Sequence, residues 1–477
     1  LWIDQQGQSN KFSYNYWSSP VGAGNNYTVD SVLKDGTNSQ NPQNITWTSA
    51  INGSPTSPIT LSTYWINKYQ NLPNGSSNWS FVGPNGALSA GQGFTLKGPG
   101  GSAPKQKYTF VGKPNDGSFS SNVSAGNINL TGNPYPSALD AYAFIEDNSA
   151  STTGTLYFWE QYTSNSSHIT ANYEGGYATL TKTGATPPVS PAGISTSGSS
   201  SHLPKRYIAV GQGFLVFGSQ TGGSIVFNNT QRAFVKENEA EATTMFRTSE
   251  VVFENKKLRL SFGTDLSEAK RQLLLGFMGD VATDSFDNGY DAVQIDTQAD
   301  DMYFPLNGQK LVIQAKGDFD ALASIPLAVK VAQPGVVTIG LDSTENFEDD
   351  EAVYLFDSET GKYHNLKSAD ASIDLGEGTF DDRFSIRFSV PATARMIEQP
   401  AVVAVAAKNG SVSIQNLSQL QISSVQLINT LGQLQASWPV NINDKMIQLE
   451  NLNVSAGNYI IKIYSSNGTF TKKININ

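Results

Sequence analysis

The fold of the C-terminal part of the chain is decided by its last stretch, Val454-Ser-Ala-Gly-Asn-Tyr-Ile-Ile-Lys-Ile-Tyr-Ser-Ser-Asn-Gly-Thr-Phe-Thr-Lys-Lys-Ile-Asn-Ile-Asn477. Residues 458–464 are β-branched and aromatic, as in a strand, and residues 469–476 alternate apolar and polar side chains. Between them, Asn467-Gly468 is a dipeptide that accepts positive φ in a tight turn. The stretch therefore predicts a β-hairpin with one buried face.

Further strands precede this hairpin. Residues 411–414, 425–433 and 446–449 each have the composition of a short strand, and Gly432 is suited to a turn. A few short strands with one apolar face each bury that face by forming two packed sheets. We expect a small immunoglobulin-like β-sandwich at the C-terminus.

The same segment resembles the C-terminal sorting domain of type IX secretion substrates from gliding and related Bacteroidetes. The resemblance is carried, in order, by Val425, Leu427, Gly432, Gly457, Tyr459, Lys462, Gly468, Lys472 and Lys473. It covers about a sixth of the chain. It implies passage through the periplasm, export across the outer membrane by the type IX translocon, and capture by an outer-membrane shuttle protein. It also implies a sortase that removes the domain and attaches the protein to a surface glycolipid. The alternative is a terminal sandwich that only caps a stalk.

Composition excludes several classes of protein. The 477 residues include no Cys, so disulfides and thiolate sites are ruled out. The net charge of −10 arises in residues 231–400, which hold 16 Lys and Arg against 30 Asp and Glu. This acidic balance argues against nucleic acid as a partner, and no apolar run is long enough for a direct membrane span. Because the chain starts at Leu1 without a leader, we expect it to be a mature form or a fragment.

The first half of the chain contains an internal duplication. One copy includes Asn15–Pro20, Tyr64–Tyr69, Gly91-Gln-Gly-Phe94 and Tyr108–Phe110, and the other includes Leu130–Pro134, Leu156–Tyr162, Gly211-Gln-Gly-Phe214 and Ile225–Phe227. Four similar elements in the same order, with the two Gly-Gln-Gly-Phe about 120 residues apart, indicate a duplicated domain or half-domain. Each Gly-Gln-Gly-Phe opens a strand, so its glycines predict a bulge or a close backbone approach.

The fold class predicted from these patterns is all-β, with tandem β-sandwich modules in several domains. A duplicated region rich in aromatic, Asn, Ser and Gly residues spans 1–235, with copies at about 1–120 and 121–235. A linker at 236–246 leads to an acidic β-sandwich at 247–390, and a second linker at 391–400 leads to the sorting domain at 401–477.

Signals for catalysis are weak. His168, His202 and His364 stand in no catalytic motif, and Glu160 with Glu174 is the candidate carboxylate pair for glycosidase chemistry. We expect no enzymatic activity and no firm cofactor. The segment Asp284, Asp287, Asp291 clusters oxygen ligands around a glycine, which makes it a candidate for Ca²⁺, although its spacing is not that of an EF-hand. The alternative is a polar turn before a strand.

Aromatic residues suggest contacts with glycans. Trp17, Trp47 and Trp79 are candidates to stack on sugars, with Asn and Ser supplying hydrogen bonds. The alternative is that such rings fill sandwich cores, which Trp65 and Trp159 favour because they hold matching places in the two copies.

The sequence thus predicts a secreted or cell-surface protein whose last domain is an export signal. Its body is expected to act as an adhesin-like or spacer module, in a setting such as gliding motility. The competing prediction is a polysaccharide-binding or polysaccharide-degrading protein, with its catalytic part upstream or within residues 1–235.

Overall fold

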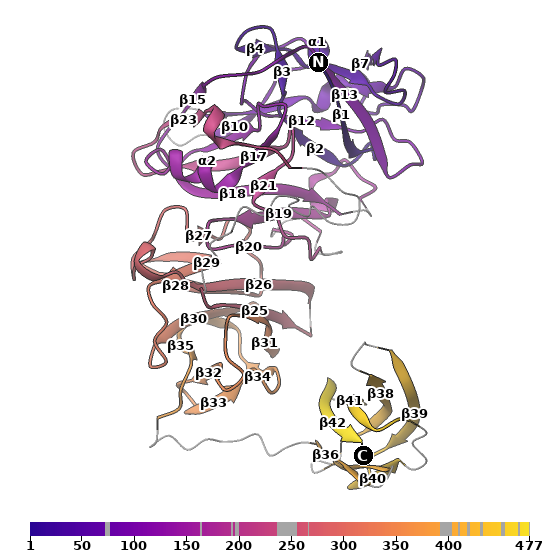
Figure 1. Ribbon diagram of the computed structural model, residues 1–477, viewed down its shortest axis with the longest axis vertical. Coiled ribbons are helices and arrows are strands. Elements are labelled where there is room, and N and C mark those ends of the chain that lie inside the picture. The colour runs from indigo at the N-terminus through magenta and orange to yellow at the C-terminus, as the bar shows by residue number, and fades with distance from the viewer. Residues whose placement is uncertain are drawn as a thin grey trace. The chain divides into compact units, whose positions relative to one another are not determined.

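The computed structural model describes residues 1–71, 77–162, 165–191, 194–195, 200–235, 255–265, 267–391, 403–408, 411–416, 420–429, 433–449, 454–465 and 468–476. Nearly all regular structure is β, which confirms the predicted fold class (Figure 1). The chain divides into two compact units, one of residues 1–351 with 372–388 and the other of residues 352–371 with 389–477. We call residues 1–235 and 255–351 with 372–388 the body.

The first copy consists of short strands. They are β1 (Trp2–Gln8), β2 (Tyr14–Trp17), β3 (Val21–Gly22), β4 (Asn26–Tyr27), β5 (Leu33–Asp35), β6 (Gln43–Asn44), β7 (Thr46–Thr48), β8 (Thr60–Ser62), β9 (Asn67–Asn71), β10 (Ser77–Phe81), β11 (Leu88–Ser89), β12 (Phe94–Lys97), β13 (Lys105–Val111) and β14 (Lys113–Pro114), with the helices α1 (Val29–Val32) and η1 (Thr63–Trp65). Most strands are too short to be seen as an alternating pattern in the sequence.

The second copy has a larger sheet. Its elements are β15 (Phe119–Val123), β16 (Ile128–Gly132), β17 (Ala138–Asp140), α2 (Ala141–Asp147), β18 (Thr152–Gln161), η3 (Thr170–Asn172), β19 (Gly175–Leu180), β20 (Ala185–Thr186), β21 (Tyr207–Ile208), β22 (Gly213–Gly218), β23 (Gly223–Phe227), η4 (Asn229–Gln231) and β24 (Arg232–Ala233). The sheet has the order β16-β22-β18-β19-β20. Helix α2 is capped by Asp140, which accepts a hydrogen bond from the Tyr142 N–H at 3.0 Å.

The strand pair at the repeated Gly-Gln-Gly-Phe recurs in both copies. Phe94 of β12 pairs with Trp17 of β2, and Phe214 of β22 pairs with Thr131 of β16. The copies also exchange contacts reciprocally. The backbone of Gln212 bridges to Trp17, and that of Gln92 bridges to Thr131. Residues 1–235 therefore form one interlocked assembly.

The glycines of the repeated Gly-Gln-Gly are required by this exchange. A Cβ on Gly213 would lie 2.9 Å from the backbone N of Trp17 in the other copy, and a Cβ on Gly93 would lie 3.0 Å from the carbonyl O of Thr131. Gly91 and Gly211 have φ of +85° and +72°, which L side chains rarely adopt. The predicted close backbone approach is confirmed.

The acidic region continues the body. Its strands are β25 (Lys257–Thr264), β26 (Ser267–Phe277), β27 (Ala292–Val293), β28 (Asp301–Leu306), β29 (Gln309–Lys316), β30 (Ser324–Val331), β31 (Gly335–Glu345), β34 (Ala371–Leu375) and β35 (Gly378–Arg387). In the sheet, hydrogen-bonded neighbours follow the order β35-β30-β28-β29-β26-β25-β31. The pairing is antiparallel except for β26 with β29, which is parallel. Strands β32 (Tyr354–Asp357) and β33 (Lys362–Asn365) form a hairpin.

The acidic strands pack directly on the second copy, as Figure 1 shows for β20 and β26. The Tyr157 hydroxyl donates to the Val293 carbonyl at 3.0 Å, and the Gln298 amide donates to the Ser190 carbonyl at 2.9 Å. The regions predicted as separate domains on either side of a linker thus share one compact unit. The predicted linker 236–246 lies outside the described residues.

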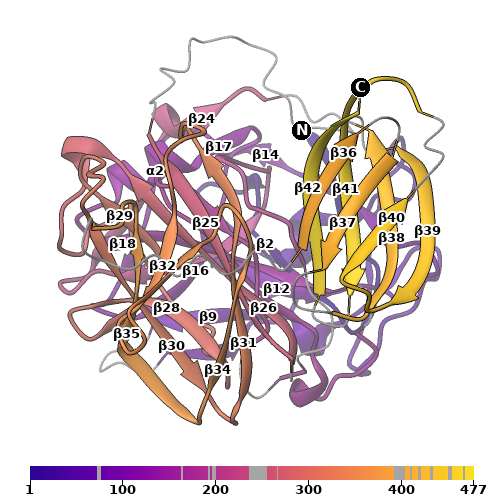
Figure 2. The same cartoon turned by 90° about the horizontal axis from the view of Figure 1, so that it is seen from below.

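The C-terminal strands form a sandwich of two sheets (Figure 2). One sheet has the order β36 (Val403–Lys408), β37 (Ser411–Asn416), β40 (Met446–Leu449), and the other has β39 (Leu434–Ile442), β38 (Ile422–Asn429), β41 (Gly457–Ser465), β42 (Gly468–Ile476). This is the strand order of an immunoglobulin-like sandwich. The predicted hairpin is confirmed as β41 with β42, but Gly468 pairs with Ser465, so it starts the return strand and is not a turn residue.

Candidate functional site

Two cavities in the body share one wall, formed by Trp159, Glu160 and Gln212. Trp159 and Glu160 lie near the end of β18. Gln212 belongs to the second Gly-Gln-Gly, whose position is set by its exchange with the first copy. The folding of the duplicated region therefore also builds this wall.

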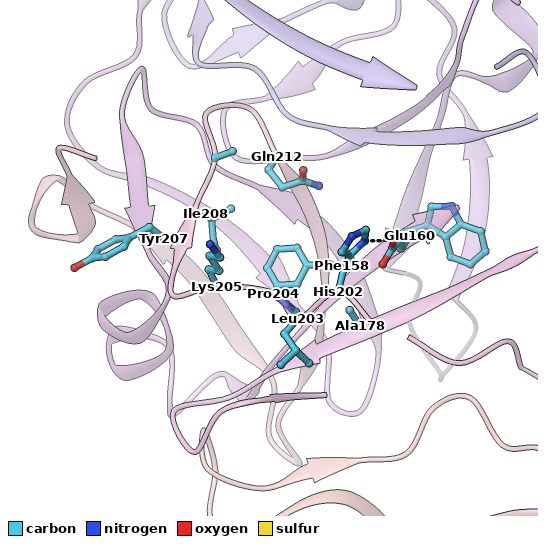
Figure 3. A pocket seen from close by; sticks show the side chains of 12 residues that line it. Phe158, Glu160, Ala178, His202, Leu203, Pro204, Lys205, Tyr207, Ile208 and Gln212 are labelled. Carbon is cyan, nitrogen blue, oxygen red and sulfur yellow. Dashed lines mark hydrogen bonds and ion pairs between the residues drawn. The ribbon is translucent and has the colours of Figure 1, made fainter. Parts of the chain in front are cut away.

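The first cavity has a volume of about 270 Å³ and lies beside the segment 202–209 (Figure 3). His202 Nδ1 lies 2.7 Å from Glu160 Oε1, and the Ser200 hydroxyl donates to the same oxygen at 2.8 Å. The His202 side chain is 86% exposed, so its contact with Glu160 is at the surface. One carboxylate and one exposed imidazole do not form the opposed carboxylate pair that glycosidases use. The backbone carbonyl of Glu174 accepts a hydrogen bond from the side-chain amide of Gln161 on β18.

The second cavity, of about 140 Å³, is lined by aromatic rings and amides. Three of its lining residues, Trp17, Trp159 and Gln161, each have a buried polar atom without a hydrogen-bond partner, namely Nε1, Nε1 and Oε1, and these atoms do not face the open space. Unpaired buried polar atoms are uncommon because their desolvation is not compensated. Trp17 packs in the core of the first copy, whereas Trp159 packs in the aromatic cluster around Tyr16.

An aromatic cluster from both copies forms the neighbouring wall. Tyr16 stacks near-parallel to Trp159, with an interplanar angle of 17°, and its hydroxyl bonds to that of Tyr177 at 2.8 Å. The hairpin of the first copy contributes Trp79, which contacts Tyr16 edge-on with centroids 5.8 Å apart. Burial raises the pKa of Tyr16 and that of Tyr177, the latter to about 12, so both stay neutral hydroxyls at physiological pH.

A second polar cluster surrounds Lys97, which is 2% exposed. Its ammonium lies 3.8 Å from the ring centroid of Trp65 and 4.3 Å from that of Tyr14, and it donates to the Tyr173 hydroxyl at 2.8 Å. His168 stacks on Trp65 and lies 3.1 Å from the amine. Burial lowers the pKa of Lys97 to about 7. Burial, followed by the charge of Lys97, lowers the pKa of His168 to about 4.

The predicted glycan contacts are spread over different environments. Trp17 is 5% exposed and packs on Tyr108 and Phe110, so its ring faces are covered. Trp47 is half-buried and its indole donates to Asp30 at 2.6 Å. Trp79 is the exposed one of the three, at 45%.

The sequence analysis did not identify Gln161. It did single out Trp17, Trp159 and Glu160, which line the second cavity, and the repeated Gly-Gln-Gly marks Gln212. The matching of Trp65 with Trp159 was wrong, since Trp65 lies in the helix η1 and Trp159 in a strand.

The calcium candidates are held apart by other contacts. Asp287 accepts from the Thr283 N–H at 2.6 Å, while Asp291 is buried and accepts from the N–H groups of Ala315 and Asp287. Burial raises the pKa of Asp291 to about 6, and Asp284 is exposed beside Lys316. Within the described ranges no group of three or more such side chains is placed to hold a metal ion. Calcium binding stays a prediction, which a melting curve with a chelator would test.

The residues that resemble a sorting motif divide into core and surface. Val425 and Leu427 are fully buried and pair with Ile463 and Ile461. The Tyr459 hydroxyl donates to the Ser455 carbonyl at 2.8 Å, four residues upstream at the entry to β41. This is the geometry of a tyrosine corner.

The remaining residues of that motif lie at the surface or in turns. Lys472 and Lys473 are exposed on β42, and Lys462 is half-exposed on β41. Gly457 and Gly468 begin these strands, and Gly432 falls outside the described residues.

In the described parts of the chain no helix has the length and apolar character needed to cross a membrane.

Comparison with known proteins gives one family. No curated protein matches the chain. A family model described as a domain of unknown function, DUF8693, matches residues 3–388. This range takes in the interlocked copies and the acidic strands, and it stops before the C-terminal sandwich. The chain belongs to the DUF8693 family.

Proposed function

We propose that the protein is a type IX secretion cargo, exported to the cell surface or the medium, and that its C-terminal sandwich is the export signal. The body is then an adhesin-like or spacer module carried to the outside. The translocon, an outer-membrane shuttle protein and a sortase are its partners on this route.

The observation that carries the proposal is the division of the motif within the sandwich. Its apolar members, such as Val425 and Leu427, are buried in the core, and Tyr459 fixes the entry to β41. Its lysines at positions 472 and 473 are exposed on the edge strand β42. A shuttle protein would thus meet a folded sheet with a basic edge, not an unfolded tag.

Separation from the body also supports the proposal. The sandwich belongs to a different compact unit from residues 1–351, and the family match ends at residue 388. A domain that adds an address to unrelated cargo is expected to fold apart from that cargo.

Deletion of residues 400–477 in the producing bacterium tests the proposal. We expect the body to remain in the periplasm or be degraded, as measured by immunoblots of medium, cell surface and periplasm. The control replaces residues 400–477 with an unrelated immunoglobulin-like sandwich, which should fail to restore export. Normal surface levels of the deletion variant would contradict the proposal.

A further inference from the structure

We infer that the C-terminal sandwich accepts one added β-strand beside β40, and that an extended, uncharged segment of the export machinery supplies it. The inference rests on the proposed function, because the export machinery meets this surface only if the sandwich is the export signal. It deepens that function by naming the surface that is recognised and the mode of recognition, which is the addition of a strand to a free sheet edge.

The first step is the unequal size of the two sheets. The four strands β39-β38-β41-β42 face the three strands β36-β37-β40. Strand β36 lies against β42, and in both Figure 1 and Figure 2 β39 lies at the other side of the sandwich, beyond β40. Among the described strands none faces β39 across the core, so the smaller sheet has room for one more strand beside β40.

The second step is the burial of the apolar side chains. Val425 and Leu427 on β38 are fully buried. Trp438 and Ala436 pair with them on β39, yet the inward side chains of β39 are only partly buried; these are Ala436, Trp438, Val440 and Ile442. An added strand would cover this apolar face, and the removal of its surface from water favours binding.

The third step is the backbone of β40. The Asn416 N–H donates to the Lys445 carbonyl at 2.9 Å, which marks a hydrogen-bonded pair of β37 with β40. Such pairs recur at every second residue of an antiparallel ladder, so Ile447 bonds to β37 while the N–H and C=O groups of Met446 and Gln448 point to the other side. Among the described strands none pairs with that side of β40.

The fourth step is charge. Edge strands are commonly protected from pairing by lysines, and β42 has two, Lys472 and Lys473. Strands β39 and β40 contain no charged residue. An uncharged segment therefore fits beside β40, and its apolar side chains should alternate, because only one face of a strand meets β39.

A second copy of the sandwich does not fit this place through its own β40. Antiparallel pairing of β40 with its counterpart requires a two-fold axis perpendicular to the sheet. That axis keeps each sheet in its layer, so the β39 of the second copy would enter the space of β38 and β39 of the first. A single extended segment avoids this clash, and on the proposed route the shuttle protein or the translocon provides it.

Proline variants of β40 test the inference in the full chain in the producing bacterium. Met446→Pro and Gln448→Pro each remove an N–H that points away from β37, and proline is tolerated on edge strands at such positions. We expect each to lower the extracellular fraction about tenfold, because a backbone hydrogen bond to the added strand is lost and the proline ring obstructs pairing. Immunoblots of medium, cell surface and periplasm measure this fraction.

Gln6→Pro is the matched control on an edge strand of the body. The Gly112 N–H donates to the Leu1 carbonyl at 3.2 Å, so the alternation along β1 points the N–H of Gln6 away from β13. Gln6 is exposed, and its replacement should leave export unchanged. Melting curves of the purified variants check folding. Met446 is the first residue of its strand, where proline is best tolerated, so Met446→Pro decides the result if Gln448→Pro melts early.

Normal export of a folded Met446→Pro or Gln448→Pro variant would overturn the inference. Equal retention of Gln6→Pro would also overturn it, since any proline on an edge strand would then have the same effect. The deletion of residues 400–477 distinguishes the two proposals. If the deletion variant is retained and the proline variants are exported, only the added strand is refuted; if the deletion variant is exported normally, the export signal itself is refuted.

Discussion

Lys97 and Arg271 are both buried cations, but the body stabilises them differently. Arg271 donates to Asp301 at 2.8 Å and to Asp296 at 2.9 Å, and these charges outweigh the effect of burial and raise its pKa. Lys97 has aromatic faces, the Tyr173 hydroxyl and His168 around it, and no ion pair to a carboxylate among the described residues. Its positive charge therefore costs stability in the folded state.

This arrangement predicts a pH dependence of stability. The pKa of Lys97 falls from 10.5 to about 7 on folding, so between these values the unfolded chain binds the proton that the folded chain has lost. Stability must then rise with pH, by up to about 1.4 kcal/mol per pH unit. Lys97→Met should remove this rise, as measured by urea unfolding at several pH values between about 7 and 9.5.

The comparison of Lys97→Met with the unchanged chain cancels other titrating groups, including the buried tyrosines with raised pKa values. Lys34→Met, which removes a half-buried lysine elsewhere in the first copy, serves as control. An equal rise in stability in the unchanged chain and in Lys97→Met would contradict the assignment.

At the scale of elements, the reciprocal Gly-Gln-Gly turns hold the copies together. Gly213→Ala would place a Cβ 2.9 Å from the backbone of both Tyr16 and Trp17, which cannot move as a side chain can. We expect a loss of about 1–3 kcal/mol or more in the free energy of unfolding, measured with urea.

Gly263→Ala is the matched strand control, since its Cβ would meet nothing closer than 3.8 Å. It should change stability little. If Gly213→Ala proved as mild as Gly263→Ala, the close approach of the two copies would be refuted.

The tyrosine corner gives a second prediction for an element. Tyr459→Phe removes the bond to Ser455 from the entry to β41 and should cost the sandwich about 0.5–1.5 kcal/mol. Hydrogen exchange followed by mass spectrometry on the full chain would show faster exchange in β38, β41 and β42. The Tyr464 hydroxyl bonds to the Gln426 side chain on an adjacent strand. Tyr464→Phe should therefore increase hydrogen exchange at the start of β41 less than Tyr459→Phe does.

Elements with strong local patterns were predictable from the sequence. The strand at 446–449 matches β40, and the alternation in residues 469–476 marks β42. Two-residue strands such as β3 and β4 carry no such pattern. The exchange between Gln212 and Trp17 depends on tertiary contacts 195 residues apart, so sequence indicated its glycines but not their partner.

At the scale of the whole molecule, the duplication and the acidic strands act as one body, and the sandwich is a separate fold. The duplication was visible because its motifs recur in order. The packing of the second copy on the acidic strands could not be predicted from the sequence, because it uses single hydroxyl and amide contacts such as that of the Tyr157 hydroxyl with the Val293 carbonyl. The candidate site had the same limit, since its lining residues come from both copies and are brought together only when the copies pack.

The most direct test of the central claim transfers the sandwich to another protein. Residues 392–477 are fused to a foreign periplasmic reporter in the producing bacterium, and the extracellular fraction of reporter activity is measured. We expect the fusion to leave the cell and the reporter alone to stay in the periplasm. Retention of the folded fusion in the periplasm, while the native protein is exported by the same cells, would contradict it.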